Sequence, residues 1–184
     1  MMTTPTSERT LILLRHAKAE QVQGKVDHDR ELAPRGLRDA RAVGQWLRGG
    51  KWLSHPSQAV VLDLVLCSTS ERTRQTLAGL LASGAAVREV LFDQRVYDAG
   101  AASLLDVLLE VPDSVSTVLM IGHAPGIPML ASTLAMDGLG STEALERLSR
   151  GFPTSGLAIL GFEGGWGSLA SETAHLREFV VPRG

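Results

Sequence analysis

The sequence has 184 residues, of which 44% are hydrophobic and 21% charged, ordinary values for a single globular domain. A formal net charge of −2 provides no overall positive field to attract nucleic acid or an anionic membrane. The single cysteine, Cys67, excludes an internal disulfide and suits a reducing compartment. Neither a secretory signal nor an apolar run of the roughly 20 residues needed to span a membrane is recognisable. We therefore expect a cytoplasmic protein that binds neither nucleic acid nor membranes.

Apolar runs alternate with helical patterns along the chain, which is typical of an α/β fold with a largely parallel sheet. The expected strands are 10–15, 62–67, 88–92, 117–121, 156–162 and, near the end, 176–181. The expected helices are 34–47, 71–81, 101–109, 126–135 and 142–148. The sequence thus predicts a three-layer α/β/α sandwich, with one domain over residues 9–184 and a flexible tail at residues 1–8.

Arginine and histidine residues follow three of these expected strands. The first strand ends in Arg15 and His16, Arg72 opens the helix after the second strand, and the fourth strand leads to His123. Because the carboxyl ends of parallel strands meet at one edge of a sheet, we expect these four side chains to converge. A neutral imidazole can act as a nucleophile, and one guanidinium group can bind two phosphoryl oxygens at once. The pattern therefore indicates a site for phosphoryl transfer.

Each of these residues, taken singly, also has an ordinary interpretation, since an arginine can belong to a solvated helix face and a histidine to a turn. A metal site is another alternative, because Asp27, His28 and Asp29 are three adjacent potential ligands. That stretch lacks the spacing of helical zinc motifs, and no cysteine accompanies it. We therefore predict a site without metal or cofactor.

Five segments carry a resemblance to a known family: LLRHAKAE, DHDRELAPRG, CSTSERTRQT, YDAG and MIGHAPG, in this order. Together they resemble the histidine phosphatase superfamily, whose fold is phosphoglycerate mutase-like, and in particular its SixA branch of small bacterial phosphohistidine phosphatases. The resemblance extends from about Leu11 to the last expected strand. It implies that His16 accepts the phosphoryl group and that the phosphate pocket is completed by Arg15, Arg72 and His123 and lined by Arg30.

The chain departs from the family pattern at two places. Gln94 stands where mutase-like members have a glutamate that protonates the leaving oxygen, and an amide cannot donate a proton in that way. The neighbouring Asp93 and Asp98 are the candidates for a replacement acid. Ala17 replaces a glycine, and the following Lys18 either adds positive charge at the mouth of the pocket or is an ordinary surface lysine.

Three functions remain compatible with these residues. The first is a metal-independent phosphatase that forms a phosphohistidine intermediate on His16 and acts on phosphohistidine of a protein, for example a histidine phosphotransfer domain. The second is a phosphatase of a small phosphomonoester, and the third is a non-catalytic module that binds phosphate. The missing glutamate favours P–N over P–O substrates, and the short chain leaves little room for a capping insertion, so we expect a shallow, open pocket.

Overall fold

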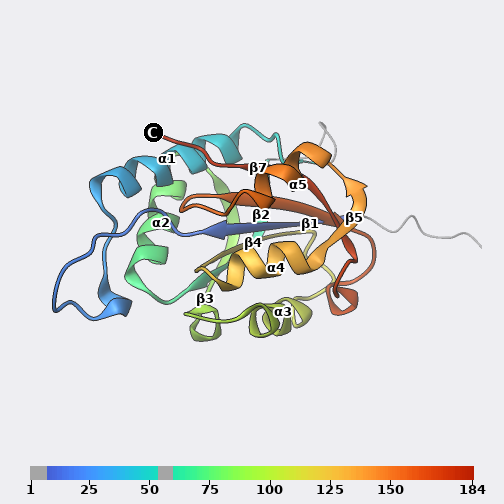
Figure 1. Cartoon of the computed structure of the whole chain (residues 1–184), viewed down its shortest axis with the longest axis horizontal. Helices are drawn as coiled ribbons and strands as arrows, with labels where there is room; N and C mark the ends of the chain where they lie inside the picture. Colours follow the sequence, from blue (N-terminus) through green and yellow to red (C-terminus); the bar gives the residue numbers. More distant parts are fainter. Residues whose placement is uncertain (1–7, 54–59) are drawn as a thin grey trace, which may run out of the picture.

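The computed structural model describes residues 8–53 and 60–184, which form a seven-stranded sheet with helices on both faces (Figure 1). The strands are β1 (Arg9–Arg15), β2 (Val61–Ser68), β3 (Ala86–Asp93), β4 (Thr117–Gly122), β5 (Ala135–Gly140), β6 (Leu157–Phe162) and β7 (Ala174–Val180). The α-helices are α1 (Pro34–Arg48), α2 (Glu71–Ala82), α3 (Ala101–Leu109), α4 (Gly126–Leu134) and α5 (Thr142–Ser149). Three 3₁₀ turns, Asp27–Asp29, Gln94–Val96 and Trp166–Ser168, complete the regular structure of the described part. The predicted α/β fold class is confirmed.

The sheet has the order β3-β2-β4-β1-β6-β7-β5 and is mostly parallel. β1 pairs in parallel with β4, β4 with β2, and β2 with β3, whereas β6 runs antiparallel to both β1 and β7. β1 and β4 are in register at their last residues, where Arg15 lies opposite Gly122. The carboxyl ends of four neighbouring strands therefore lie along one edge.

Alternate side chains of β1 enter two separate hydrophobic cores, as the two-residue period of a strand requires. Leu11 and Leu13 pack on the side of α3 and α4, while Ile12 and Leu14 pack on the side of α1 and α2. All four side chains are fully buried. This two-sided burial explains why the strand reads as a continuous apolar run in the sequence.

Two glycines allow helices to lie directly on the loops that follow the strands. A Cβ atom at Gly36, in the first turn of α1, would lie 2.1 Å from the carbonyl oxygen of Lys18. A Cβ atom at Gly126, where α4 begins, would lie 2.0 Å from the carbonyl oxygen of Ala99. The loop after β1 therefore packs against the start of α1, and the turn before α3 packs against the start of α4, at distances that only glycine permits.

The expected elements correspond to observed ones with end points that shift by one or two residues, with one exception. The strand β5 was not predicted, and α4 ends just before it rather than at residue 135. The expected tail lies outside the described residues except for Glu8, whose carboxylate is 3.0 Å from Nε2 of His175 on β7. In the described ranges, no helix has the length and apolar character needed to cross a membrane.

The strand β3 forms one edge of the sheet, and in the described part of the chain only β2 pairs with it. Its side chains are largely exposed on both faces, including Leu91 and Phe92. The guanidinium of Arg74 lies over the Phe92 ring, 4.4 Å from its centre.

Candidate active site

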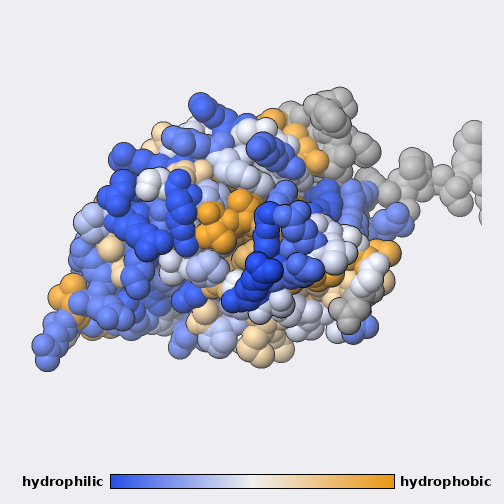
Figure 2. All heavy atoms as spheres, turned by 45° about the horizontal axis from the view of Figure 1, so that its top comes forward, coloured by the Kyte–Doolittle hydropathy of each residue, from blue (hydrophilic) through white to orange (hydrophobic). Residues whose placement is uncertain are grey.

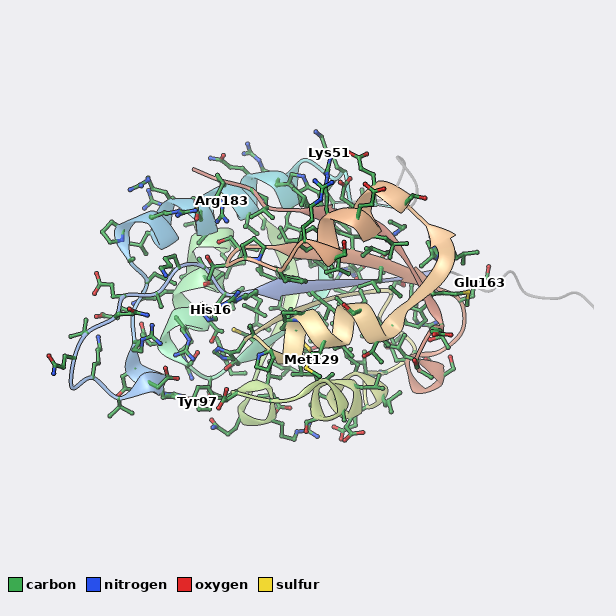
Figure 3. All side chains as sticks on the ribbon, in the orientation of Figure 1. His16, Lys51, Tyr97, Met129, Glu163 and Arg183 are labelled. Atoms are coloured by element: carbon green, nitrogen blue, oxygen red, sulfur yellow. The ribbon has the colours of Figure 1, made fainter. Side chains whose placement is uncertain are left out.

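The polar residues of the candidate site come from the ends of β1, β2 and β4. Arg15 and His16 end β1, Ser68 ends β2, and His123 follows β4. In Figure 3, His16 lies at the end of β1, between Tyr97 and Arg183, and Glu163 marks the opposite end of the molecule. The rings of His16 and His123 are 5.1 Å apart, so the structure brings the two histidines together as the parallel strands predict.

The imidazole of His16 is oriented by its own loop. Its Nδ1 lies 2.7 Å from the carbonyl oxygen of Ala17, and because a carbonyl only accepts, Nδ1 carries the hydrogen. The Ala17 amide donates in turn to Oγ1 of Thr76, which lies one helical turn after Arg72 on α2. Burial, together with the nearby arginines, lowers the pKa of His16 to about 4. At neutral pH the Nε2 atom therefore has a free lone pair.

His123 is fixed through both ring nitrogens. A terminal nitrogen of Arg72 donates to Nδ1 over 3.2 Å, so the hydrogen lies on Nε2, which donates to Oγ of Ser68 over 2.9 Å. Burial, aided by the charges of His16 and Arg72, lowers the pKa of His123 to about 3. In this arrangement, the neutral ring of His123 orients Arg72.

Arg72 is buried and bound to the 3₁₀ turn that begins at Asp27. Its two terminal nitrogens donate to the carbonyl oxygen of Asp27 over 2.5 Å and to the carboxylate over 2.9 Å. The same carboxylate accepts hydrogen bonds from Arg30 and from the hydroxyl of Tyr97, each over 2.9 Å. Partial desolvation of the carboxylate opposes its ionisation, but these donors hold the pKa of Asp27 well below its usual range. Asp27 is thus an anion bound by two arginines of the site.

Arg15 and Arg30 retain donors for a ligand. One terminal nitrogen of Arg15 donates to the carbonyl oxygen of Phe152 over 2.8 Å, while its buried Nε has no hydrogen-bond partner among the described residues. Arg30 is anchored through Nε to the carbonyl oxygen of Glu20 over 2.9 Å. Both guanidinium groups are therefore fixed in place and can bind a further anion.

These residues surround a cavity of about 460 Å³ whose lining is mainly polar. Four of its side chains are cationic, two are anionic, and the two histidines are neutral, so its lining has a net positive charge that suits a phosphoryl dianion. The lining residues are Arg15, His16, Lys18, Ala19, Gln21, Asp27, Arg30, Arg72, Asp98, His123, Ala124 and Thr154.

The predicted additional residues divide into two groups. Lys18 and Asp98 line the cavity, and Asp98 has a left-handed backbone, with φ of 51°. Asp93 does not line it, because its carboxylate binds Arg95 over 2.8 Å at the edge of the sheet. Gln94 is exposed, does not line the cavity either, and accepts a hydrogen bond from Thr69.

Sequence reasoning missed three contributors and misjudged a fourth. Three residues have no local signal beyond their places near predicted site residues: Ser68, which binds His123, Thr76, which binds the Ala17 amide after His16, and Tyr97. Asp27 was considered only as a metal ligand, together with its neighbours. In the described part of the chain, no group of three or more His, Cys, Asp or Glu side chains is arranged to hold a metal, and Asp27 binds arginines instead.

Comparisons with known proteins agree on one family. The family model of the histidine phosphatase superfamily (branch 1) matches residues 11–96. An uncharacterized protein of Mycobacterium tuberculosis is 39% identical over 170 residues, which are 92% of this chain and 100% of that protein. A solved structure of a candidate phosphohistidine phosphatase, SixA from Nakamurella multipartitia, is 38% identical, with a TM-score of 0.79 and coverage of 97% of this chain and 99% of that one. A phosphoglycerate mutase from Plasmodium falciparum, 16% identical, shares the fold alone, with a TM-score of 0.58 over 97% of this chain and 94% of that one.

Proposed function

The chain belongs to the histidine phosphatase superfamily, and on that premise we propose that it is a metal-independent phosphatase of phosphohistidine carried by a protein. One observation carries the proposal most directly. The neutral imidazole of His16 has its Nδ1 hydrogen bound to a backbone carbonyl and its Nε2 free, in a cavity with a net positive lining. This is the protonation state that a nitrogen nucleophile needs at neutral pH.

The reaction has two steps. In the first, the Nε2 lone pair of His16 attacks phosphorus in line and forms a new P–N bond. The P–N bond of the substrate breaks at the same time, and its electron pair leaves with the substrate imidazole, which is already protonated on its other nitrogen and departs as a neutral molecule. In the second step, a water oxygen attacks phosphorus, the bond to His16 breaks, and phosphate is released. Phosphoryl transfer depends mainly on positioning and charge neutralisation, which Arg15, Arg30 and Arg72 provide.

The surroundings of the leaving group support a P–N substrate. An alkoxide needs a proton from a positioned acid, whereas an imidazole that is protonated on its other nitrogen leaves as a neutral molecule. Gln94 has no acidic proton, and the carboxylate of Asp93 is held by Arg95 away from the cavity. The connection between β3 and α3 spans only residues 94–100, so this segment is too short to form a cap over the pocket.

A second candidate function has one observation in its favour. Asp98 lines the cavity, whereas Asp93 does not. A carboxylic acid there would assist an alcohol leaving group, as a phosphatase of a small phosphomonoester requires.

Phosphate release from three substrates tests the proposal: a protein phosphorylated on histidine, a phosphoserine peptide and p-nitrophenyl phosphate. We expect kcat/KM for phosphohistidine to exceed that for phosphoserine by about 10²–10⁴-fold, the usual contribution of a general acid, with the aryl phosphate between them. Activity should also persist in EDTA. Equal rates on phosphohistidine and phosphoserine, or activity lost in EDTA and restored by Zn²⁺ or Mg²⁺, would contradict the proposal, and no turnover at all would favour a binding module.

A further inference from the structure

A second hollow lies on the surface between α5 and the end of β7. It has a volume of about 600 Å³ and is mainly apolar. Figure 2, which brings the α1, β7 and α5 side of the molecule forward, shows apolar surface near the middle of this face, bordered by hydrophilic side chains. The hollow is lined by Arg147, Arg150, Gly151, Phe152, Pro153, Phe179, Val180 and Val181, and no carboxylate belongs to this lining.

The hollow adjoins the phosphate pocket through one turn of the chain. Phe152 and Pro153 line the hollow, and the next residue, Thr154, lines the phosphate pocket. Consecutive Cα atoms are about 3.8 Å apart, so the two depressions share a rim. The guanidinium of Arg183 donates to the carbonyl oxygen of Thr154 over 3.0 Å, while Val181, two residues earlier, lines the hollow. The described surface is thus continuous from one depression to the other.

A protein substrate has to cover this shared rim. The phosphate pocket is open, and a histidine that reaches it must project from the surface of its protein. A specific protein interface covers about 800 Å² of each partner, far more than the mouth of a pocket for one phosphoryl group. A partner that places its histidine beside His16 therefore also meets the neighbouring hollow.

The lining of the hollow indicates the chemistry of the covering residues. Phe152, Phe179 and Val181 offer apolar surface to an apolar side chain, whose burial would stabilise a complex. The side chain of Arg150 is 79% exposed, and its guanidinium lies 4.0 Å from the carboxylate of Glu146. This contact is long and therefore weak, so the charge of Arg150 is available to a carboxylate of a partner. Arginine beside apolar surface is a common combination at the centre of interfaces.

We propose that the hollow is a docking site for the phosphohistidine-carrying protein. It would receive an apolar side chain, flanked by a carboxylate, next to the phosphorylated histidine. This inference rests on the proposed function, because it assumes that the substrate histidine belongs to a protein. Docking would lower KM for such a protein and leave the chemistry on a small substrate unchanged.

Two P–N substrates of different size provide the test: a histidine phosphotransfer domain phosphorylated on its histidine, and phosphoramidate. The variant Val181→Glu places a charge in the hollow. We expect its KM for the domain to rise at least tenfold, with kcat/KM for phosphoramidate within twofold of the wild type. The matched control is Leu139→Glu, because Leu139 is also an exposed apolar residue but lies on β5, far from the site, and it should change neither substrate.

A charge reversal, Arg150→Glu, provides an independent variant at an exposed position and should raise KM for the domain at least threefold. An unchanged KM for the domain in both variants would overturn the docking site, as would equal losses on both substrates. Wild type that hydrolyses the domain no better than phosphoramidate would also overturn it. If the wild type hydrolyses neither substrate, the proposed function fails, and direct binding of the phosphorylated domain to the wild type and to Val181→Glu then decides the docking site alone.

Discussion

The contact of Asp27 with two site arginines leads to a prediction about anion affinity. The carboxylate accepts from Arg30 and Arg72 over 2.9 Å each, and both guanidinium groups line the cavity. A phosphoryl dianion that binds the same arginines meets this negative charge at close range. The substitution Asp27→Asn removes the charge and keeps the size of the side chain, so it should strengthen the binding of inorganic phosphate.

The size of the effect follows from Coulomb's law. Two unit charges about 4 Å apart interact by about 1 kcal/mol in water and about 4 kcal/mol at the effective dielectric constant near a protein surface. The side chain of Asp27 is 54% exposed, so solvent and salt reduce the repulsion toward the lower value. We expect a gain of about 1.4 kcal/mol, which corresponds to phosphate binding about tenfold more tightly.

Isothermal titration with phosphate measures this affinity without any turnover. The matched control is Asp29→Asn in the same turn, since Asp29 has the same charge but lies 3.4 Å from His28 rather than beside the arginines. Its affinity should stay within about threefold of the wild type. Unchanged or weaker phosphate binding by a folded Asp27→Asn variant would refute the reasoning, because Asp27 would then act mainly by holding Arg72 in position.

Four further predictions concern the nucleophile, the acid, the histidine charges and the packing. His16→Ala should lose at least 10³-fold in kcat with an unchanged circular dichroism spectrum; near-normal kcat would mean another nucleophile. Asp98→Asn should leave turnover of phosphohistidine within about threefold, and a selective loss on alkyl phosphates would identify Asp98 as a general acid. The lowered pKa values of His16 and His123, about 4 and 3, mean that the unfolded chain binds protons before the folded one does as the pH falls. Urea titrations should therefore show the free energy of unfolding falling by about 3–6 kcal/mol between about pH 6.5 and 4; a pH-independent value would contradict this. Gly126→Ala should lower the free energy of unfolding by about 1–3 kcal/mol, because the added Cβ would lie 2.0 Å from a backbone oxygen. The control Gly100→Ala, with no atom within 4 Å of its added Cβ, should cost less than about 1 kcal/mol. Equal effects of the two substitutions would show that the close contact at Gly126 relaxes freely.

The main features of the fold could be predicted because local pattern and tertiary environment agree. The apolar run of β1 and the helical spacing of apolar residues in α1 both reflect side chains that are buried in the structure. The strand β5 could not be predicted in the same way. It includes Gly138 and Gly140, both with positive φ, and glycine has a low strand propensity, so only pairing with β7 makes this segment a strand.

The arrangement of the site was predictable only where the backbone determines it. Parallel strands bring their carboxyl ends together, and this backbone arrangement alone places Arg15, His16 and His123 at one edge of the sheet. The contact between Asp27 and Arg72 joins residues 45 positions apart in the sequence, so no local sequence pattern indicates it. Asp27 was weighed only as a metal ligand, an alternative that was set aside, so its role beside the arginines was not predicted.

The exposed edge strand β3 has a consequence for how the protein behaves at high concentration. An uncovered strand edge is a template for pairing with other chains, and exposed residues such as Leu91 and Phe92 add to that risk. Arg88 and Glu89 interrupt the run at its centre, and Arg88 is anchored to Asp63 over 3.2 Å. Charged side chains at the centre of an edge strand disfavour edge-to-edge pairing with another chain, so Arg88 and Glu89 oppose aggregation through a part of the molecule that takes no part in its chemistry.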